Sequence, residues 1–420
     1  MRTTLLYIIP LQIKAFIWYN IWVKSFNWGI NLKKLYYSIF DTKVVNKTRQ
    51  FEIDMAKVVL MFFLPFVHLT GECINDLSKG LPYFFDSIIG GPFGAPVFMF
   101  TIGFGLVYAR KNSPRDLTIH AIRVGIAGII LNIFRYLIPS LIGYAITHNR
   151  EYYLDTLLNK MFESDILQFA FLAIIAIALM IKFKFRHYVM LLVGIGCSIV
   201  GNLPFIKGLD TGNDLLNMVL GYFIGTANKD ETIYSTFPLL NWLIIPIIGY
   251  VFTRYWIKVK NKDLFYLVVS PISAIIGLIY IFYGVANGRG MFAKGEYCYY
   301  HLRLDDAIAS MFVLFAMLGL YHVLGKVFSK GIKNFVMGAS KVLTSYYCIH
   351  YFFVCMSVYV FIFPFGPPHG KDIMEKGKDF ISMPWVLALS AIIVVATGIV
   401  THFYRKFREA DIFLSRIRFK

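Results

Sequence analysis

Charged residues are scarce in this chain. They make up 16% of its 420 residues, whereas a typical soluble domain is about a quarter charged. Acidic residues are the scarcer kind, with 24 Asp and Glu against 42 Lys and Arg, so the formal net charge is +18. The low charge excludes a large soluble domain. The basic excess does not indicate nucleic-acid binding, because the basic residues sit at the ends of apolar runs, as insertion orientation and anionic lipids require.

Several functional motifs are also missing. The five cysteines form no CxxC pair and no zinc-like spacing with histidine, so no metal site is predicted. HExxH, GxSxG, Walker and Rossmann patterns do not occur in a sensible context. No internal repeat is evident, which disfavours a transporter built from repeats. Cys73 and Cys298 fall in loops expected on the same outer side, and a disulfide between them is left open.

The chain is rich in apolar residues, at 58%. Runs of about 17–22 residues match the ~30 Å hydrocarbon thickness of a bilayer. The sequence therefore predicts an all-α, polytopic membrane helical bundle of about ten transmembrane helices. The run 215–224 is too short to span and is predicted to be re-entrant or packed in a loop. The ten predicted spans are 54–71, 92–109, 120–140, 165–181, 188–206, 237–253, 264–284, 306–324, 342–363 and 384–404.

Loop charge alternates along the chain, with basic loops after every second predicted span and acidic loops between them. The positive-inside rule then places both termini in the cytoplasm, which agrees with an even number of spans. We expect a multi-pass protein of a bacterial cytoplasmic membrane.

Three segments are predicted. Residues 1–48 form an interfacial helix or an extra span, because Lys and Trp side chains suited to the headgroup region interrupt their apolar character. These residues contain no small-residue cleavage site, so no signal peptide is predicted. Residues 49–405 form the transmembrane domain, and residues 406–420 form a basic cytoplasmic tail.

His68 is the first candidate for chemistry, since it lies in the first apolar span. An ionisable group at bilayer depth is costly and usually faces a cavity or a partner. Lys57 precedes it by eleven residues, about 16 Å and three turns along a helix, so both share one face. A functional interpretation has Lys57 bind an anionic donor while His68 acts on an acceptor. The structural alternative has Lys57 snorkel to the headgroups and His68 bond a neighbouring helix.

The string Asp54-x-x-Lys57-(x10)-His68 resembles the signature of the acyltransferase-3 family, which carries an arginine, ten residues and a histidine in its first core helix. The run 96–105, PVFMFTIGFG, is similar to that family's second-helix motif. Its Gly103 and Gly105 are expected to allow close helix packing.

Two other stretches look more like the heparan-α-glucosaminide N-acetyltransferase catalytic-domain family. They are DILQ at 165–168 and FPLLNW at 237–242. Both families belong to one transmembrane acyltransferase superfamily, and the resemblance covers about residues 49–405.

This resemblance implies an acyl-CoA donor, usually acetyl-CoA, reached from the cytoplasm and an acceptor on the far side. Lys57 replaces the usual arginine, so a bidentate contact is lost there. The heparan-α-glucosaminide N-acetyltransferase family has its catalytic histidine in the loop after the first helix. No histidine occurs between residues 69 and 119 here, so only His68 can take that role.

Arg110, Arg115 and Arg123 follow the second predicted span. With Lys57 they are candidates for holding CoA phosphates, which guanidinium groups match well. Ordinary positive-inside charge is the alternative. Arg135, near the outer end of its helix, is expected to snorkel.

The remaining candidates are a second histidine within a span and four residues expected on the outer side of the membrane. His350, about nine residues into the ninth span, resembles a late Tyr-x-x-x-His element of acyltransferase-3 proteins. It is predicted to assist catalysis or to form a structural bond between helices. The candidates for acceptor binding are Asp165, Gln168, Tyr300 and His301. The structural alternatives are helix capping, which is sufficient to account for Asp165, and anchoring at the membrane interface for Tyr300.

The sequence thus predicts an enzyme: an acyl-CoA-dependent O- or N-acyltransferase that modifies a cell-envelope glycan or a lipid-linked acceptor. It is expected to contact membrane lipid, to use no metal and to bind no nucleic acid. A homodimer is left open. The alternatives are a proton-coupled transporter or flippase for an anionic or glycan-linked solute, and a non-catalytic scaffold.

Overall fold

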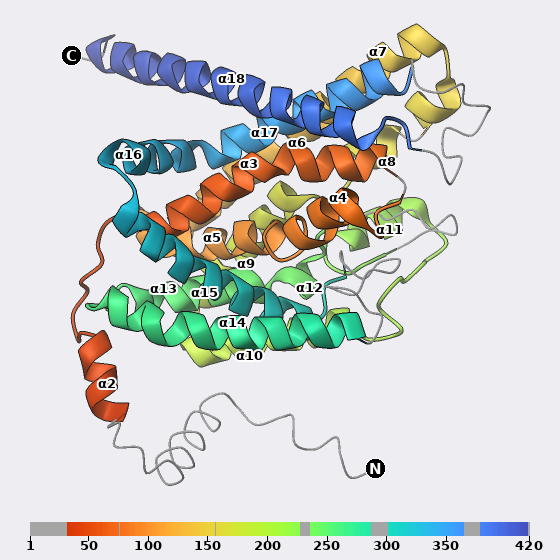
Figure 1. Ribbon diagram of the computed structural model, residues 1–420. Helices are drawn as coiled ribbons and strands as arrows, with labels where there is room; N and C mark the ends of the chain where they lie inside the picture. Colours follow the sequence, from red (N-terminus) through yellow and green to blue (C-terminus); the bar gives the residue numbers. More distant parts are fainter. Residues whose placement is uncertain are drawn as a thin grey trace.

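The computed structural model describes residues 32–74, 76–155, 157–226, 236–286, 301–364 and 379–418. Regular structure in these residues is helical, and β-pairing there is limited to two isolated bridges. The predicted all-α fold class is confirmed (Figure 1).

Several helices run directly into π-helical turns. The π-helical turns are Phe84–Ile89, Ile133–Leu137, Glu151–Asp155 and Ser357–Ile362, and a 3₁₀ turn covers Ser340–Val342. The α-helices are α2 (Leu32–Ile39), α3 (Phe51–Cys73), α4 (Gly80–Tyr83), α5 (Ala95–Tyr108), α6 (Pro114–Asn132), α7 (Ile138–Thr147), α8 (Leu157–Met161), α9 (Ile166–Lys182), α10 (His187–Gly201), α11 (Asp214–Gly221), α12 (Leu239–Trp242), α13 (Ile244–Trp256), α14 (Lys262–Ala286), α15 (Leu304–Val327), α16 (Lys330–Ala339), α17 (Leu343–Met356) and α18 (Met383–Arg418).

Each of the ten predicted spans contains a helix, but the helices differ in length. Within the described residues, six helical segments are long and apolar enough to cross a membrane. The other predicted spans coincide with α5, α9, α10 and the α12–α13 pair, which are shorter. A count of ten therefore stays a prediction. The six segments are Phe51–Cys73, Pro114–Thr147, Lys262–Gly284, Leu304–Val327, Lys330–Ile362 and Met383–Phe407.

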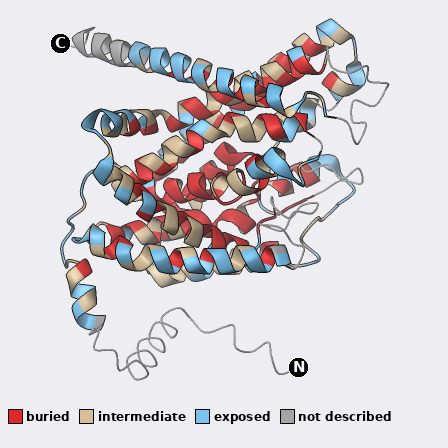
Figure 2. Cartoon of the chain, in the orientation of Figure 1, coloured by how far each residue is buried: buried red, intermediate tan, exposed pale blue. Residues whose placement is uncertain are grey.

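The outer faces of the long helices are apolar. On α14, Ile275 and Ile279 are exposed, and on α18 so are Ile392 and Val395. Figure 2 shows buried residues on the inner helices and exposed residues along the outer faces of α14 and α18. Apolar side chains exposed along whole helices suit contact with lipid, so the protein is a membrane protein.

α3 is a central helix. It packs against α5, α15, α16, α17 and α18, so its side chains reach most of the bundle. At its first turn, Glu52 is buried and lies 2.7 Å from Nδ1 of His322 on α15 and 3.6 Å from Nζ of Lys262 on α14. These contacts fix the start of α3 against two neighbouring helices.

α5 and α13 cross at backbone contact. A Cβ atom at Gly103 would lie 1.9 Å from the carbonyl oxygen of Pro246, and one at Gly249 would lie 2.2 Å from that of Phe100. The expected packing role of Gly103 is thus confirmed. Gly105 is different, because a Cβ atom added there would meet nothing within 4 Å. The prediction for Gly105 was wrong, because that residue lies on the open side of α5.

The two ends of the bundle differ in the elements that they carry. α2 and α16 lie at one end, and α8 and α11 lie at the other (Figure 1). The run 215–224, predicted to be too short to span, forms α11 of 8 residues. Of the predicted N-terminal segment, residues 1–31 lie outside the described residues, and α2 leads into a stretch bonded to the loop after α13. The predicted tail continues α18 as helix to Arg418.

Candidate active site

His68 lines a cavity of about 370 Å³. The cavity is formed by α3, by the start of α5, by the segment before α9 and by α17, so it brings together parts of the chain that are far apart in sequence. The polar side chains among its lining residues are His68, Glu72, Asp86, Ser87, Arg135, Glu163, Asp165, Thr236, Tyr347 and Tyr351.

The His68 imidazole is held by aromatic neighbours. Its ring centroid is 4.4 Å from that of Tyr351 and 5.4 Å from that of His350. Its Nε2 atom is buried and has no hydrogen-bond partner among the described residues. A buried nitrogen without a partner is unfavourable unless a ligand or water satisfies it. The ring is thus oriented by packing against Tyr351 and His350, and it lines the cavity with Nε2 unused by the described part of the protein.

Arg135 does not snorkel, contrary to expectation. It lies on the π-helical turn between α6 and α7, and it is 1% exposed. Its Nη1 pairs with Oδ2 of Asp165, and its Nη2 lies 4.0 Å from Oε2 of Glu163. Its Cζ is 4.6 Å from the ring centroid of Tyr351. The expectation failed because carboxylates inside the protein, which hydropathy does not reveal, attract the guanidinium inward.

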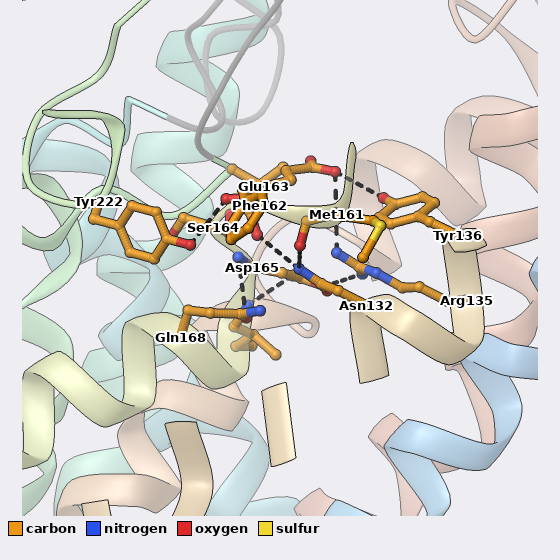
Figure 3. Close-up of polar contacts among 12 residues, drawn as sticks. Asn132, Arg135, Tyr136, Met161, Phe162, Glu163, Ser164, Asp165, Gln168 and Tyr222 are labelled. Carbon is orange, nitrogen blue, oxygen red and sulfur yellow. Dashed lines mark hydrogen bonds and ion pairs between the residues drawn. The ribbon is translucent and has the colours of Figure 1, made fainter. Parts of the chain in front are cut away.

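Hydrogen bonds fix the segment before α9 against α6 and its π-helical turn. Nδ2 of Asn132 donates to the carbonyl oxygens of Met161 (2.8 Å) and Glu163 (3.1 Å). The hydroxyl of Tyr136 donates to Oε2 of Glu163 at 2.7 Å. Figure 3 shows these side chains converging beside Arg135. Two carboxylates are thereby held at the cavity wall.

The capping role predicted for Asp165 is confirmed. As N-cap of α9 it forms a capping box with Gln168, and its Oδ1 accepts from the backbone N–H of Ile166 at 2.6 Å. Its Oδ2 accepts from the hydroxyl of Tyr347 at 2.8 Å and pairs with Arg135. Asp165 lines the cavity, whereas Gln168 is not among the lining residues. An acceptor-binding role for either residue stays a prediction.

His350 lies next to His68 but outside the cavity. It is fully buried, its Nδ1 lies 3.2 Å from the carbonyl oxygen of Tyr346, and it does not line the cavity. It contacts the ring that faces the cavity. A role for His350 in the chemistry therefore passes through His68.

The predicted donor-binding residues lie apart from this cavity. Lys57 is half-buried near Asp54, which pairs with Arg49 (2.5 Å) and accepts from Oγ of Ser340 (2.8 Å). The three arginines predicted to bind the donor are exposed, and none of them forms an ion pair with another described residue. These are Arg110, Arg115 and Arg123. Their role in binding a donor stays a prediction.

Of the other predicted acceptor residues, Tyr300 lies outside the described residues. His301 is buried against Gly225, where an added Cβ would lie 1.8 Å from its Nε2, and it does not line the cavity. Cys73 is buried at the end of α3, while Cys298 lies outside the described part of the chain, so their pairing stays open.

The burial of His301 leads to a testable pH dependence. Burial lowers its pKa to about 4, and the charge of Lys207 adds to that effect. In the unfolded chain this imidazole takes up a proton as the pH falls below about 6.5, whereas in the folded protein it stays neutral down to about pH 4. The free energy of unfolding is therefore expected to fall as the pH decreases from about 6.5 to about 4. His301→Gln should flatten this part of the pH profile of the melting temperature in detergent. His402→Gln, a change at an exposed histidine, should leave the slope as in the parent.

Comparison with known families decides the identity of the domain. The family model described as an acyltransferase domain, Acyl_transf_3, matches residues 50–404. The chain belongs to the acyltransferase-3 family. The match includes Lys57, His68 and every residue that lines the cavity. No curated protein and no solved structure matches the chain. The likeness of two stretches to the heparan-α-glucosaminide family stays a prediction.

As a member of the acyltransferase-3 family, the protein is a membrane acyltransferase. The sequence indicated His68 and Asp165 as site residues but not Arg135, Glu163 and Tyr351, which also line the cavity. Arg135 carried the same signal as His68, an ionisable residue inside an apolar run. Tyr351 and Glu163 carried no signal of their own, since tyrosines and loop carboxylates are common near membrane interfaces.

Proposed function

We propose that this acyltransferase moves an acetyl group from cytoplasmic acetyl-CoA to an extracytoplasmic acceptor, a glycan of the cell envelope. The observation that carries the proposal is the buried His68, which lines a cavity of about 370 Å³ within the domain of the family and whose Nε2 has no hydrogen-bond partner in the described part of the chain. Resemblance to the family supports the donor and the acceptor class. The loop charges support ten spans with both termini in the cytoplasm. The membrane in this proposal is a bacterial cytoplasmic membrane.

The reaction needs a base and a proton donor in turn. Nε2 of His68 takes the proton of an acceptor hydroxyl or amine, and the freed lone pair attacks the carbonyl carbon of the thioester. The tetrahedral intermediate collapses with cleavage of the carbon–sulfur bond. The thiolate takes the proton from the imidazolium, so the products are the acylated acceptor and free CoA. In a variant of this path, Nε2 itself carries the acyl group between donor and acceptor.

Donor binding is proposed at the basic end of the bundle. Lys57 and the exposed Arg110, Arg115 and Arg123 would contact the phosphates of CoA, which carry the charge that guanidinium and ammonium groups recognise. Lys57 is about 16 Å below His68 along α3. The thioester arm would therefore extend inward along this helix.

The donor is tested by binding. CoA and acetyl-CoA are expected to raise the melting temperature of the purified protein in detergent, since a ligand at 100 times its dissociation constant adds about 2.7 kcal/mol to the free energy of unfolding. Lys57→Ala should weaken this shift. An unchanged melting temperature with saturating acetyl-CoA would contradict the donor assignment.

The whole reaction is tested on envelope material. Glycans from cells with and without the protein are compared by mass spectrometry, and the acetylated species should occur only with the protein. The proximity of His68 and His350 also suits a proton relay, the basis of the transporter alternative. Solute uptake by proteoliposomes without any acyl donor, and no acetylated glycan in cells, would favour that alternative.

A further inference from the structure

Arg135 has more hydrogen-bond donors than the protein uses. Of its three nitrogen atoms, Nη1 bonds Asp165, while Nε and Nη2 are buried and have no hydrogen-bond partner among the described residues. Nη2 is 4.0 Å from Glu163, which is too long for a hydrogen bond. Leaving donors of a charged group unsatisfied in the interior costs free energy. A ligand oxygen in the cavity would remove that cost.

The guanidinium is held firmly in place. Asp165 fixes one edge of it, and Asp165 is itself fixed by the N–H of Ile166 (2.6 Å) and the hydroxyl of Tyr347 (2.8 Å). The Cζ atom of Arg135 lies over two aromatic rings, 4.5 Å from the ring centroid of Tyr136 and 4.6 Å from that of Tyr351. Donors held in this way need no reorganisation when charge develops nearby.

Arg135 and His68 serve the same cavity. Both line it, and both contact the ring of Tyr351, whose centroid is 4.4 Å from that of His68 and 4.6 Å from Cζ of Arg135. A base and a fixed pair of N–H donors around one space are the two requirements of acyl transfer through a tetrahedral intermediate.

We propose that Arg135 is a catalytic residue that donates hydrogen bonds to the carbonyl oxygen of the acyl group, and that Asp165 is the positioning residue that orients it. This inference rests on the proposed function. When the acceptor attacks, the electrons of the C=O π bond move to the oxygen, and the N–H groups of Arg135 stabilise the negative charge. Collapse restores the C=O bond and expels the thiolate. Arg135 keeps its protons throughout, while His68 takes the acceptor's proton and returns it to sulfur.

Arg135 is less suited to binding a phosphate of the donor than to stabilising the acyl carbonyl oxygen. Its charge is already balanced by Asp165, and it is 1% exposed. A multiply charged phosphate would have to be desolvated and brought close to Asp165 and Glu163, both of which line the same cavity. A single developing charge on a carbonyl oxygen carries much less of that cost.

The test measures transfer of labelled acetyl from acetyl-CoA to envelope glycans taken from cells that lack the protein. Arg135→Gln is expected to lower kcat on the order of 10²–10³-fold, the size seen when one donor of an oxyanion site is removed. The KM for acetyl-CoA should change little. The double variant Arg135→Gln/Asp165→Asn removes both charges of the close pair, so Asp165 is not left as a buried carboxylate without its cation, while Glu163 keeps the hydrogen bond from Tyr136. It should show the same loss of kcat.

Two further variants separate catalysis from structure. Tyr222→Phe, which removes a hydrogen bond to the carbonyl oxygen of Phe162 (2.9 Å) in the same segment but does not touch the cavity, should retain kcat within a few-fold. In Arg135→Ala, added guanidinium at low, non-denaturing concentration should restore part of kcat, whereas ammonium should not.

The inference is overturned if the double variant folds, as judged by its melting temperature, and keeps kcat within fivefold of the parent. In that case the proposed function would still hold if the parent protein transfers acetyl and His68→Ala does not. A parent protein that transfers no acetyl would instead contradict the proposed function itself.

Discussion

His68→Ala is expected to abolish acetyl transfer while binding of acetyl-CoA persists. The imidazole is the proposed base in the cavity, and removal of a general base lowers a rate by about 10²–10⁴-fold. Where His68 carries the acyl group itself, the loss would be complete. The donor phosphates would be held about 16 Å away along α3, so binding should not depend on this ring.

Measurement needs two readouts on the same preparation. Transfer of labelled acetyl to envelope glycans reports the chemistry, and the rise in melting temperature with CoA reports donor binding. His350→Gln, at a buried ring that does not line the cavity, should lower the rate less than His68→Ala. His402→Ala, at an exposed position, is the neutral control. Transfer at the parent rate by His68→Ala would reject both forms of the mechanism.

Gly103→Ala is expected to prevent correct assembly of the bundle. Its new methyl group would lie 1.9 Å from the carbonyl oxygen of Pro246 and 2.7 Å from the backbone nitrogen of Tyr250. A side chain can rotate away from such a clash, but the backbone of α13 cannot. Overpacking in a core ordinarily costs about 1–3 kcal/mol, and a clash with backbone requires the two helices to separate.

Gly105→Ala is the matched control, because it adds the same methyl group two residues further on, where nothing lies within 4 Å. The yield of monodisperse protein in size-exclusion chromatography and the melting temperature should fall for Gly103→Ala and not for Gly105→Ala. Because α5 supplies Ala95 and Phe98 to the cavity, any folded Gly103→Ala protein should also lose acetyl transfer. Equal behaviour of the two variants would contradict the close crossing of α5 and α13.

Gly103 and Gly105 show that a sequence motif does not reveal which of its residues contact a neighbouring helix. The run 96–105 resembles a helix motif of the family, and both glycines were expected to allow close packing. Only one of them faces α13, because positions two residues apart point about 200° apart around a helix. Deciding which face meets a neighbour requires the position of that neighbour, which a single sequence does not contain.

The residues of the cavity were also only partly predictable from the sequence. His68 was found from the sequence because an imidazole in an apolar run is costly and rare. The position of Arg135 was misjudged because its partner Asp165 is 30 residues away and the next member of the group, Tyr347, is 182 residues from Asp165. Pairing energies between such distant groups do not appear in hydropathy or in local charge.

By itself, the sequence determined that this protein is an all-helical membrane protein with a polar centre near His68. It could do so because a backbone in lipid must satisfy its own hydrogen bonds, which leaves a long apolar run little choice but helix. Only the tertiary structure decided which side chains share the cavity and which cations are neutralised inside it. That outcome depends on helices from distant parts of the chain meeting at specific faces, and the energy of each contact exists only once they meet.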